Sequence, residues 1–167
     1  MAPIVDTTLP VSVRLLNKNS YEKAAWVLHM LRHDMGDELF KECVQSFYKK
    51  YKFGNVLTED FQEVAEKISG KDYDTFFNQW FHKPGHPVLS ASWERRGKKT
   101  ILTITQHQED HIFNFPLDIE ITGRSGKSTR LTLEIQQREQ GFVLDLPFVA
   151  KKIKLDPDSW LLYEEYF

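Results

Sequence analysis

The chain has 167 residues and a formal net charge of -2, which argues against a nucleic-acid-binding protein, because such proteins usually carry a clear excess of basic residues. Hydrophobic residues make up 41% of the sequence, enough for a sizeable core, and this length fits one large domain or two small ones. The single cysteine, Cys43, excludes an internal disulfide bond, and no apolar run is long enough to span a membrane.

The amino-terminal part of the chain predicts an arm and then an apolar helix. Residues 1–14 hold two prolines and several β-branched residues, and we expect an extended arm there. A helix is predicted from about Asn17 to Asp34, with Asn19 or Ser20 as its cap. From Ala24 to Leu31 it is apolar almost all round, a pattern typical of a helix buried on every side. Because little chain precedes it, we expect incomplete cover and self-association through the exposed part.

Three further helices with short connections follow. Apolar residues recur at helical spacing from about Asp37 to Lys52, opposite a charged face. Thr58 is expected to cap a third helix that Gly70 closes, and a fourth opens at Asp72 and ends before Pro84-Gly85. Together these patterns predict a small helical subdomain of about four helices over residues 15–83.

After Pro87 the hydrophobic period changes from 3.6 to 2, which indicates strands. The clearest alternation runs from Phe113 to Ile121, and turn residues separate it from its neighbours. The pattern predicts an antiparallel β-sandwich over residues 84–167 and an α+β fold class for the whole chain. The expected strands lie at about residues 88–95, 100–106, 113–121, 131–135, 142–146 and 152–155.

Some local patterns suggest chemistry only weakly. His29 and His33 lie one helical turn apart and could share a metal ion, but Met30 stands where a metalloprotease helix would carry its glutamate. Residues 125–128, Ser-Gly-Lys-Ser, lack the earlier glycine of a phosphate-binding loop and join two predicted strands, so we expect a hairpin turn. Cys43 lies on an apolar helix face, typical of a small buried hydrophobe. We therefore assign no metal-binding or cofactor-binding residue in this chain.

Tyr21-Glu22-Lys23-Ala24, followed by Trp26–Arg32, is the first of three motifs that occur in a characteristic order. It is similar to the Tyr-x-Lys-Gly helix of zinc aminopeptidases of the aminopeptidase N type, except that Ala24 replaces glycine. Gly54-Asn55-x-x-Thr58-x-x-Phe61 resembles the next loop-to-helix junction of the family. Trp80 followed by Pro84-Gly85-His86-Pro87-Val88 resembles its passage from the catalytic domain into a β-sandwich.

The resemblance implies a role for Tyr21 and a larger enzyme. In the family, the tyrosine that matches Tyr21 donates a hydrogen bond to the tetrahedral intermediate, where a phenol aimed at the oxyanion lowers the barrier. Family members bind zinc through a His-Glu-x-x-His helix and a further glutamate, and hold the substrate amine with a Gly-x-Met-Glu-Asn segment. None of these motifs occurs here. We therefore expect residues 15–83 to be the second half of a thermolysin-like catalytic domain whose zinc ligands lie upstream of Met1.

The resemblance further implies that the full-length enzyme uses Zn²⁺ to remove amino-terminal residues from peptide substrates. This chain would supply Tyr21, would pair with the missing zinc-binding half, and would be inactive by itself. The alternative is a non-catalytic protein-interaction module with the same architecture. In that case Tyr21 is an ordinary interface residue with a hydrogen-bonded hydroxyl. The sequence upstream of Met1 distinguishes the two hypotheses.

Overall fold

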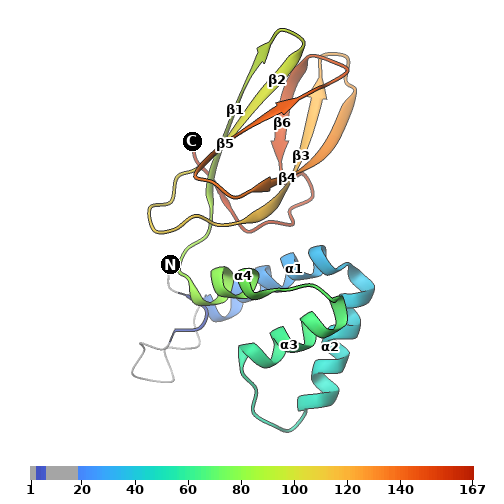
Figure 1. Cartoon of the computed structure of the whole chain (residues 1–167), viewed down its shortest axis with the longest axis vertical. Coiled ribbons are helices and arrows are strands. Elements are labelled where there is room, and N and C mark those ends of the chain that lie inside the picture. Colours follow the sequence, from blue (N-terminus) through green and yellow to red (C-terminus); the bar gives the residue numbers. More distant parts are fainter. Residues whose placement is uncertain (1–2, 7–18) are drawn as a thin grey trace. The chain divides into compact units, whose positions relative to one another are not determined.

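The computed structural model of the chain describes residues 3–6 and 19–167, and it divides into two compact units, Met1–Pro84 and Gly85–Phe167. The described helices lie in the first unit and the strands in the second (Figure 1), so the expected α+β class is confirmed. Most of the expected extended arm lies outside the described residues. Within the described ranges, no helix is both long and apolar enough to cross a membrane.

The helical unit begins with a π-helical turn, η2 (Asn19–Lys23), which runs directly into α1 (Ala24–Met35). Gly36, with φ of 82°, separates α1 from α2, because a residue with a side chain rarely adopts this backbone conformation. Gly70, in the left-handed conformation, ends the third helix as expected. The remaining elements are α2 (Asp37–Tyr51), α3 (Thr58–Ser69), α4 (Asp74–Phe77) and the π-helical η3 (Asn78–His82).

Hydrogen bonds at both ends join α1 to the segment formed by α4 and η3. Near the end of α1, Asp34 accepts hydrogen bonds from the Tyr73 hydroxyl at 2.7 Å and the Lys71 ammonium at 2.9 Å, just before α4. Near the start of α1, the Lys23 ammonium donates to the Lys83 carbonyl at 3.0 Å, just after η3. These contacts make the two segments run in opposite directions alongside each other, as Figure 1 shows.

The core of the helical unit is aromatic. Trp80 and Phe77 are almost fully buried, and the Phe77 and Phe81 rings stack with their centroids 5.0 Å apart. Phe61 of α3 contacts both Phe77 and Phe47 of α2, which connects the helices. Aromatic side chains bury a large apolar area each, so this short unit obtains most of its packing from few residues.

The start of α3 corrects one expectation. Thr58 is the first residue of the helix rather than its cap, and the Asp60 carboxylate accepts a hydrogen bond from the Leu57 amide at 2.8 Å. A second donor, the Tyr51 hydroxyl, reaches Asp60 at 3.1 Å. Aspartate suits this place because it accepts from unpaired amides at the positive end of the helix dipole.

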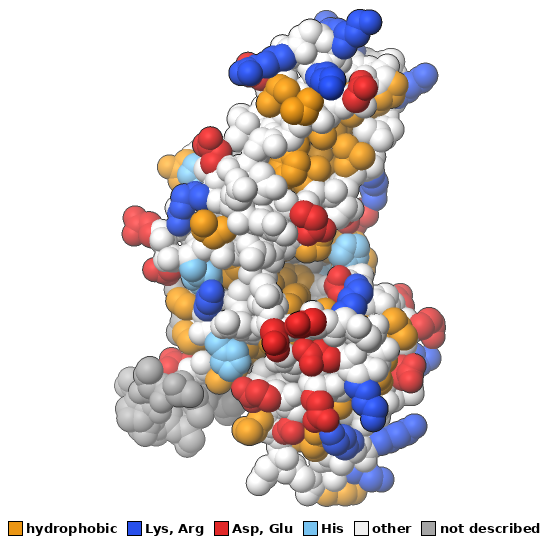
Figure 2. Space-filling model, in the orientation of Figure 1, with side chains coloured by type: hydrophobic (Ala, Val, Ile, Leu, Met, Phe, Trp, Pro, Cys, Tyr) orange, Lys and Arg blue, Asp and Glu red, His pale blue; other side chains and the backbone are white. Residues whose placement is uncertain are grey.

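Apolar cover in the helical unit is incomplete, as expected from α1. Val27 and Leu31 are fully buried on one side of α1, whereas Trp26 on another side is 38% exposed. The predicted apolar stripe of α2 is also only partly covered, because Cys43 alone is fully buried and Tyr48 remains 66% exposed. Hydrophobic side chains therefore reach the surface of this unit beside charged ones, as in the lower part of Figure 2.

The second unit consists of two sheets, with strand orders β5-β2-β1-β7 and β4-β3-β6. Neighbouring strands are antiparallel except β7, which pairs in parallel with β1. This arrangement confirms the predicted β-sandwich. The strands are β1 (Val88–Arg96), β2 (Lys99–Gln106), β3 (Phe115–Gly123), β4 (Ser128–Ile135), β5 (Glu139–Leu144), β6 (Ala150–Leu155) and β7 (Glu164–Glu165).

Alternating residues of β2 and β3 form most of the sandwich core. Leu102 and Ile104 of β2, and Leu117, Ile119 and Ile121 of β3, are fully buried, while the residues between them are more exposed. Pro116 lies where β3 pairs with β4 alone, since β6 pairs only from Ile119 onward. A residue without an amide hydrogen is tolerated there because one side of the strand lacks a partner.

Gln106 at the end of β2 is a buried polar side chain with every polar group in use. Its amide nitrogen donates to the Phe113 carbonyl at 2.9 Å and the Gln137 carbonyl at 3.2 Å. Its oxygen accepts from the Phe113 amide at 3.0 Å and the Gln108 side chain at 2.7 Å. Gln106 thus joins the β2–β3 connection to the β4–β5 connection. Without Gln106, the Phe113 amide and carbonyl would lose these hydrogen bonds, and a buried polar group without a hydrogen bond is costly.

We expect Gln106→Leu to lower the free energy of unfolding of the sandwich unit by about 2–4 kcal/mol, because the buried Phe113 amide and carbonyl lose their partners. Urea denaturation of the two proteins measures this difference. Gln136→Leu, at an exposed position in the same unit, is the matched control and should change stability by less than about 0.5 kcal/mol. Equal losses for the two variants would contradict the role given to Gln106.

Candidate functional site

Tyr21 lies in the π-helical turn η2 and its side chain is 63% exposed. Glu22 beside it is exposed as well, whereas Lys23 in the same turn is buried. The turn continues into α1, so Tyr21 lies at the amino-terminal end of a helix, where the backbone dipole favours negative charge. An exposed phenol at this place can donate a hydrogen bond to a molecule outside the unit. The side chains of the proposed caps, Asn19 and Ser20, are outside the described part of the structure.

Lys23, two residues after Tyr21 in the sequence, is a buried charged residue with only 3% of its surface exposed. Its ammonium donates to the carbonyl of Lys83, 60 residues further along the chain, at 3.0 Å. Burial lowers the pKa of Lys23 from its usual 10.5 to about 8, because the charged form loses solvation. The sequence pattern alone did not indicate this residue, although a lysine at the start of an almost wholly apolar helix was an available signal.

The two histidines of α1 do not form a metal site with other side chains. His29 contacts the Trp26 ring edge-to-face, with centroids 5.6 Å apart, and His33 is exposed one turn later. Across residues 3–6 and 19–167, neither belongs to a group of three side chains that could hold a metal ion. The spacing of His29 and His33 therefore does not bring a third ligand to them.

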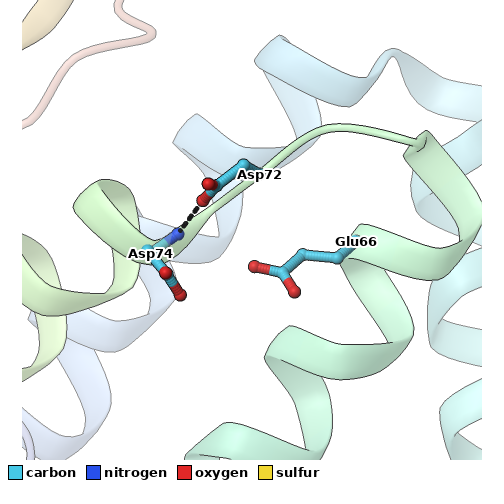
Figure 3. A group of neighbouring side chains, drawn as sticks. All are labelled: Glu66, Asp72 and Asp74. Atoms are coloured by element: carbon cyan, nitrogen blue, oxygen red, sulfur yellow. Dashed lines mark hydrogen bonds between the residues drawn. The ribbon is translucent and has the colours of Figure 1, made fainter.

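A single group of three potential ligands occurs among the described residues, namely Glu66, Asp72 and Asp74 (Figure 3). Its carboxylates already accept hydrogen bonds. Asp72 accepts from the Asp74 amide at 2.8 Å, and Glu66 accepts from the Tyr73 amide at 3.0 Å. The Gln62 side chain donates to both Glu66 and Asp74. These bonds organise the start of α4, and a set of three carboxylates does not fit zinc, which prefers nitrogen and sulfur ligands.

Three other motifs from the sequence have structural roles. Cys43 is fully buried, and burial raises the pKa of its thiol to about 11, so a nucleophilic thiolate is disfavoured there. Residues 125–128 lie at the β3–β4 hairpin turn, where Gly126 has φ of 83°, as expected for a turn rather than a phosphate-binding loop. His107 is half-buried, forms a hydrogen bond with Ser90 at 2.7 Å and stacks on Tyr166, which directly follows β7 of the same sheet.

The lowered pKa of Lys23 predicts a pH dependence of stability. Between about pH 8 and 10.5 the unfolded chain binds more protons at Lys23 than the folded chain does, so the free energy of unfolding should rise with pH across this window. The gain at this residue is at most about 3 kcal/mol.

Lys23→Met should remove that rise, which a comparison of the two denaturation curves at a series of pH values measures. Lys67→Met, at an exposed position of α3, is the matched control and should keep it. Identical pH profiles for the chain with Lys23 and the chain with Met at this position would show that the ammonium is not desolvated in the folded unit.

Comparison with known proteins shows which family the helical unit resembles. Residues 12–80, which include Tyr21 and Lys23, match the peptidase family M1 domain. "Aminopeptidase 2, mitochondrial" of Saccharomyces cerevisiae is 40% identical over 81 residues, which cover 48% of this chain and 8% of that protein. "Probable aminopeptidase 2" of Sulfurisphaera tokodaii is 28% identical over 159 residues, covering 92% of this chain and 19% of that protein.

The fold is shared with a solved aminopeptidase. The crystal structure of Legionella pneumophila aminopeptidase A in complex with aspartic acid matches 99% of this chain with a TM-score of 0.82 and 24% sequence identity. The match covers 20% of that chain, so the present chain spans at most about a fifth of the length of these relatives. The helical unit matches the peptidase family M1 domain over residues 12–80, and the chain as a whole resembles the carboxyl-terminal region of aminopeptidases of that family.

Proposed function

We propose that this chain is the carboxyl-terminal part of a zinc aminopeptidase that removes amino-terminal residues from peptides, and that Tyr21 stabilises the tetrahedral intermediate. The observation that carries the proposal is the M1 match over residues 12–80, a range that includes Tyr21 and Lys23, which resemble the family's Tyr-x-Lys motif. The relatives compared are themselves named aminopeptidases. The share of their length that the chain spans is consistent with a piece of a larger catalytic protein.

The chemistry assigned to Tyr21 is hydrogen-bond donation. When a peptide carbonyl becomes tetrahedral, its oxygen gains negative charge, and a donor aimed at that oxygen stabilises the transition state more than the substrate. The phenol of Tyr21 is 63% exposed, so it is available to a group outside the helical unit. The helix end that carries it adds a favourable dipole for the same developing charge.

Zinc would be bound by residues outside this chain. The described side chains include no three-ligand group besides the all-carboxylate set of Glu66, Asp72 and Asp74, which does not fit the ion. The present residues would then orient the substrate and donate to the oxyanion, while the metal would supply Lewis-acid chemistry from the other half of the domain. One tightly bound zinc ion per molecule of this chain alone would contradict this assignment.

The uncovered apolar surface of the helical unit suits the missing half of the catalytic domain as its partner. Trp26 of α1, Val44 and Tyr48 of α2, and Phe53 in the loop after α2 are all exposed, the last at 98%. Such a surface is usually covered in the complete protein, because exposed apolar area is unfavourable in water.

Without that partner, we expect the isolated chain to self-associate through the helical unit. Analytical ultracentrifugation over a range of concentrations should show a dimer or a larger species, because two copies can cover each other's apolar side chains. Trp26→Glu should shift the equilibrium toward the monomer, and Trp93→Glu, at a comparably exposed residue of the sandwich unit, is the control. A monomer at all concentrations would argue against an uncovered interface.

We expect Tyr21→Phe in the full-length enzyme to lower kcat by about a hundredfold to a thousandfold with little change in KM, since the lost bond forms only in the transition state. Stability should hardly change, because the ring is retained and the hydroxyl is exposed. Steady-state kinetics with an aminoacyl reporter and thermal unfolding provide the two measurements.

Tyr166→Phe is the matched control, because Tyr166 is 57% exposed, lies in the sandwich unit and should leave kcat unchanged. Unchanged kcat for Tyr21→Phe together with a large loss of stability would make Tyr21 a structural residue. No aminopeptidase activity in the full-length protein, together with an upstream sequence that lacks the His-Glu-x-x-His motif, would favour the non-catalytic interaction module.

A further inference from the structure

We propose that Lys23 is a positioning residue for Tyr21: its buried side chain anchors the π-helical turn η2 to the Lys83 carbonyl and so fixes where the phenol points. The inference rests on the proposed function of Tyr21. It assigns to Lys23 a role that acts through Tyr21 and involves no contact with substrate.

Packing within the helical unit does little to fix the Tyr21 side chain. The side chain is 63% exposed, so neighbouring residues cover only a minor part of it. The direction of the phenol therefore depends on the backbone of η2, the five-residue turn in which it lies. A donor to an oxyanion needs a defined position, because a misplacement of about 1 Å can reduce the rate roughly a hundredfold.

The buried Lys23 side chain holds the turn η2 in place. Lys23 closes η2, is 3% exposed and donates to the Lys83 carbonyl at 3.0 Å. The two residues are 60 positions apart, so this single bond ties the start of α1 to the end of the helical unit. It lies two residues from Tyr21, closer than the Asp34–Tyr73 bond at the other end of α1.

The bond from Lys23 to the Lys83 carbonyl connects two irregular turns. Both η2 and η3 are π-helical, and Lys83 follows η3 directly. Such turns are rare, disturb the regular helical bonds, and are often found at functional sites. A further bond, from the Val5 amide to the Phe81 carbonyl at 2.9 Å, also ends on η3. The Lys23 side chain therefore links the irregular turn η2, which carries Tyr21, to the end of the irregular turn η3, which the Val5 amide also contacts.

The ammonium group of Lys23 is costly to bury. Burial is the cause of the lowered pKa of Lys23, and an uncharged side chain of similar length would avoid that penalty. If the side chain at position 23 only filled space, an uncharged residue would be the more stable choice there. Natural sequences that depart from such a rule of stability commonly do so at functional sites.

The experiment uses the full-length enzyme with Lys23→Met, Lys23→Arg and the control Lys67→Met. We expect Lys23→Met to lower kcat about tenfold to a hundredfold, with KM within about threefold and an unchanged or higher Tm. Lys23→Arg should recover part of the lost kcat, because the guanidinium can still donate to the Lys83 carbonyl. A fall in Tm that matches the loss of activity, with normal kcat per folded molecule, would overturn the proposal.

The double variant Tyr21→Phe with Lys23→Met separates this inference from the proposed function. If Lys23 acts through Tyr21, the double variant should have the same kcat as Tyr21→Phe alone. Additive losses would mean that Lys23 acts by another route, which would overturn the positioning role while leaving the role of Tyr21 intact. If Tyr21→Phe alone leaves kcat unchanged, the proposed function itself fails, and the positioning role fails with it.

Discussion

The antiparallel pairing of α1 with the α4–η3 segment is the constraint on which the helical unit depends. It is held at one end by Asp34 with Tyr73 and Lys71, and at the other by Lys23 with the Lys83 carbonyl. Between these ends, Val27 and Leu31 of α1, and Phe77 and Trp80 of the opposite segment, are among the most buried side chains of the unit. Polar bonds at the ends and apolar burial in between favour the same register, so each supports the other.

The candidate site lies where this pairing is least regular. Both segments have π-helical turns at the Lys23–Lys83 end, whereas the Asp34 end has ordinary helix termini. Tyr21 is exposed and Lys23 is buried within the same five residues, so one turn presents a phenol outward and inserts an ammonium inward. In the proposed function, the outward phenol needs a fixed backbone, and the inward ammonium would supply it at the cost of a buried charge.

The sandwich unit reaches stability by different means. Its core is aliphatic apart from a few aromatic side chains, and alternation along β2 and β3 supplies most of it. The buried Gln106 side chain links two of its connections by hydrogen bonds to the Phe113 and Gln137 carbonyls. Asp156 does similar work near the carboxyl end, where its carboxylate accepts from the Trp160 and Leu161 amides at 2.8 Å each. The uncovered apolar side chains that suit a partner in the M1 family interpretation are those of the helical unit.

The sequence by itself determined the element types and the fold class, because hydrophobic periods of 3.6 and 2 depend on residues that are near neighbours in the chain. It also determined the candidate tyrosine and the family resemblance through local motifs. Only the tertiary structure decided that Lys23 is buried, that the Asp60 carboxylate rather than Thr58 accepts an amide hydrogen bond at the start of α3, and that Tyr166 stacks on His107. These features depend on contacts between distant or competing groups, such as a bond across 60 residues, and no local pattern specifies which distant carbonyl a lysine will meet.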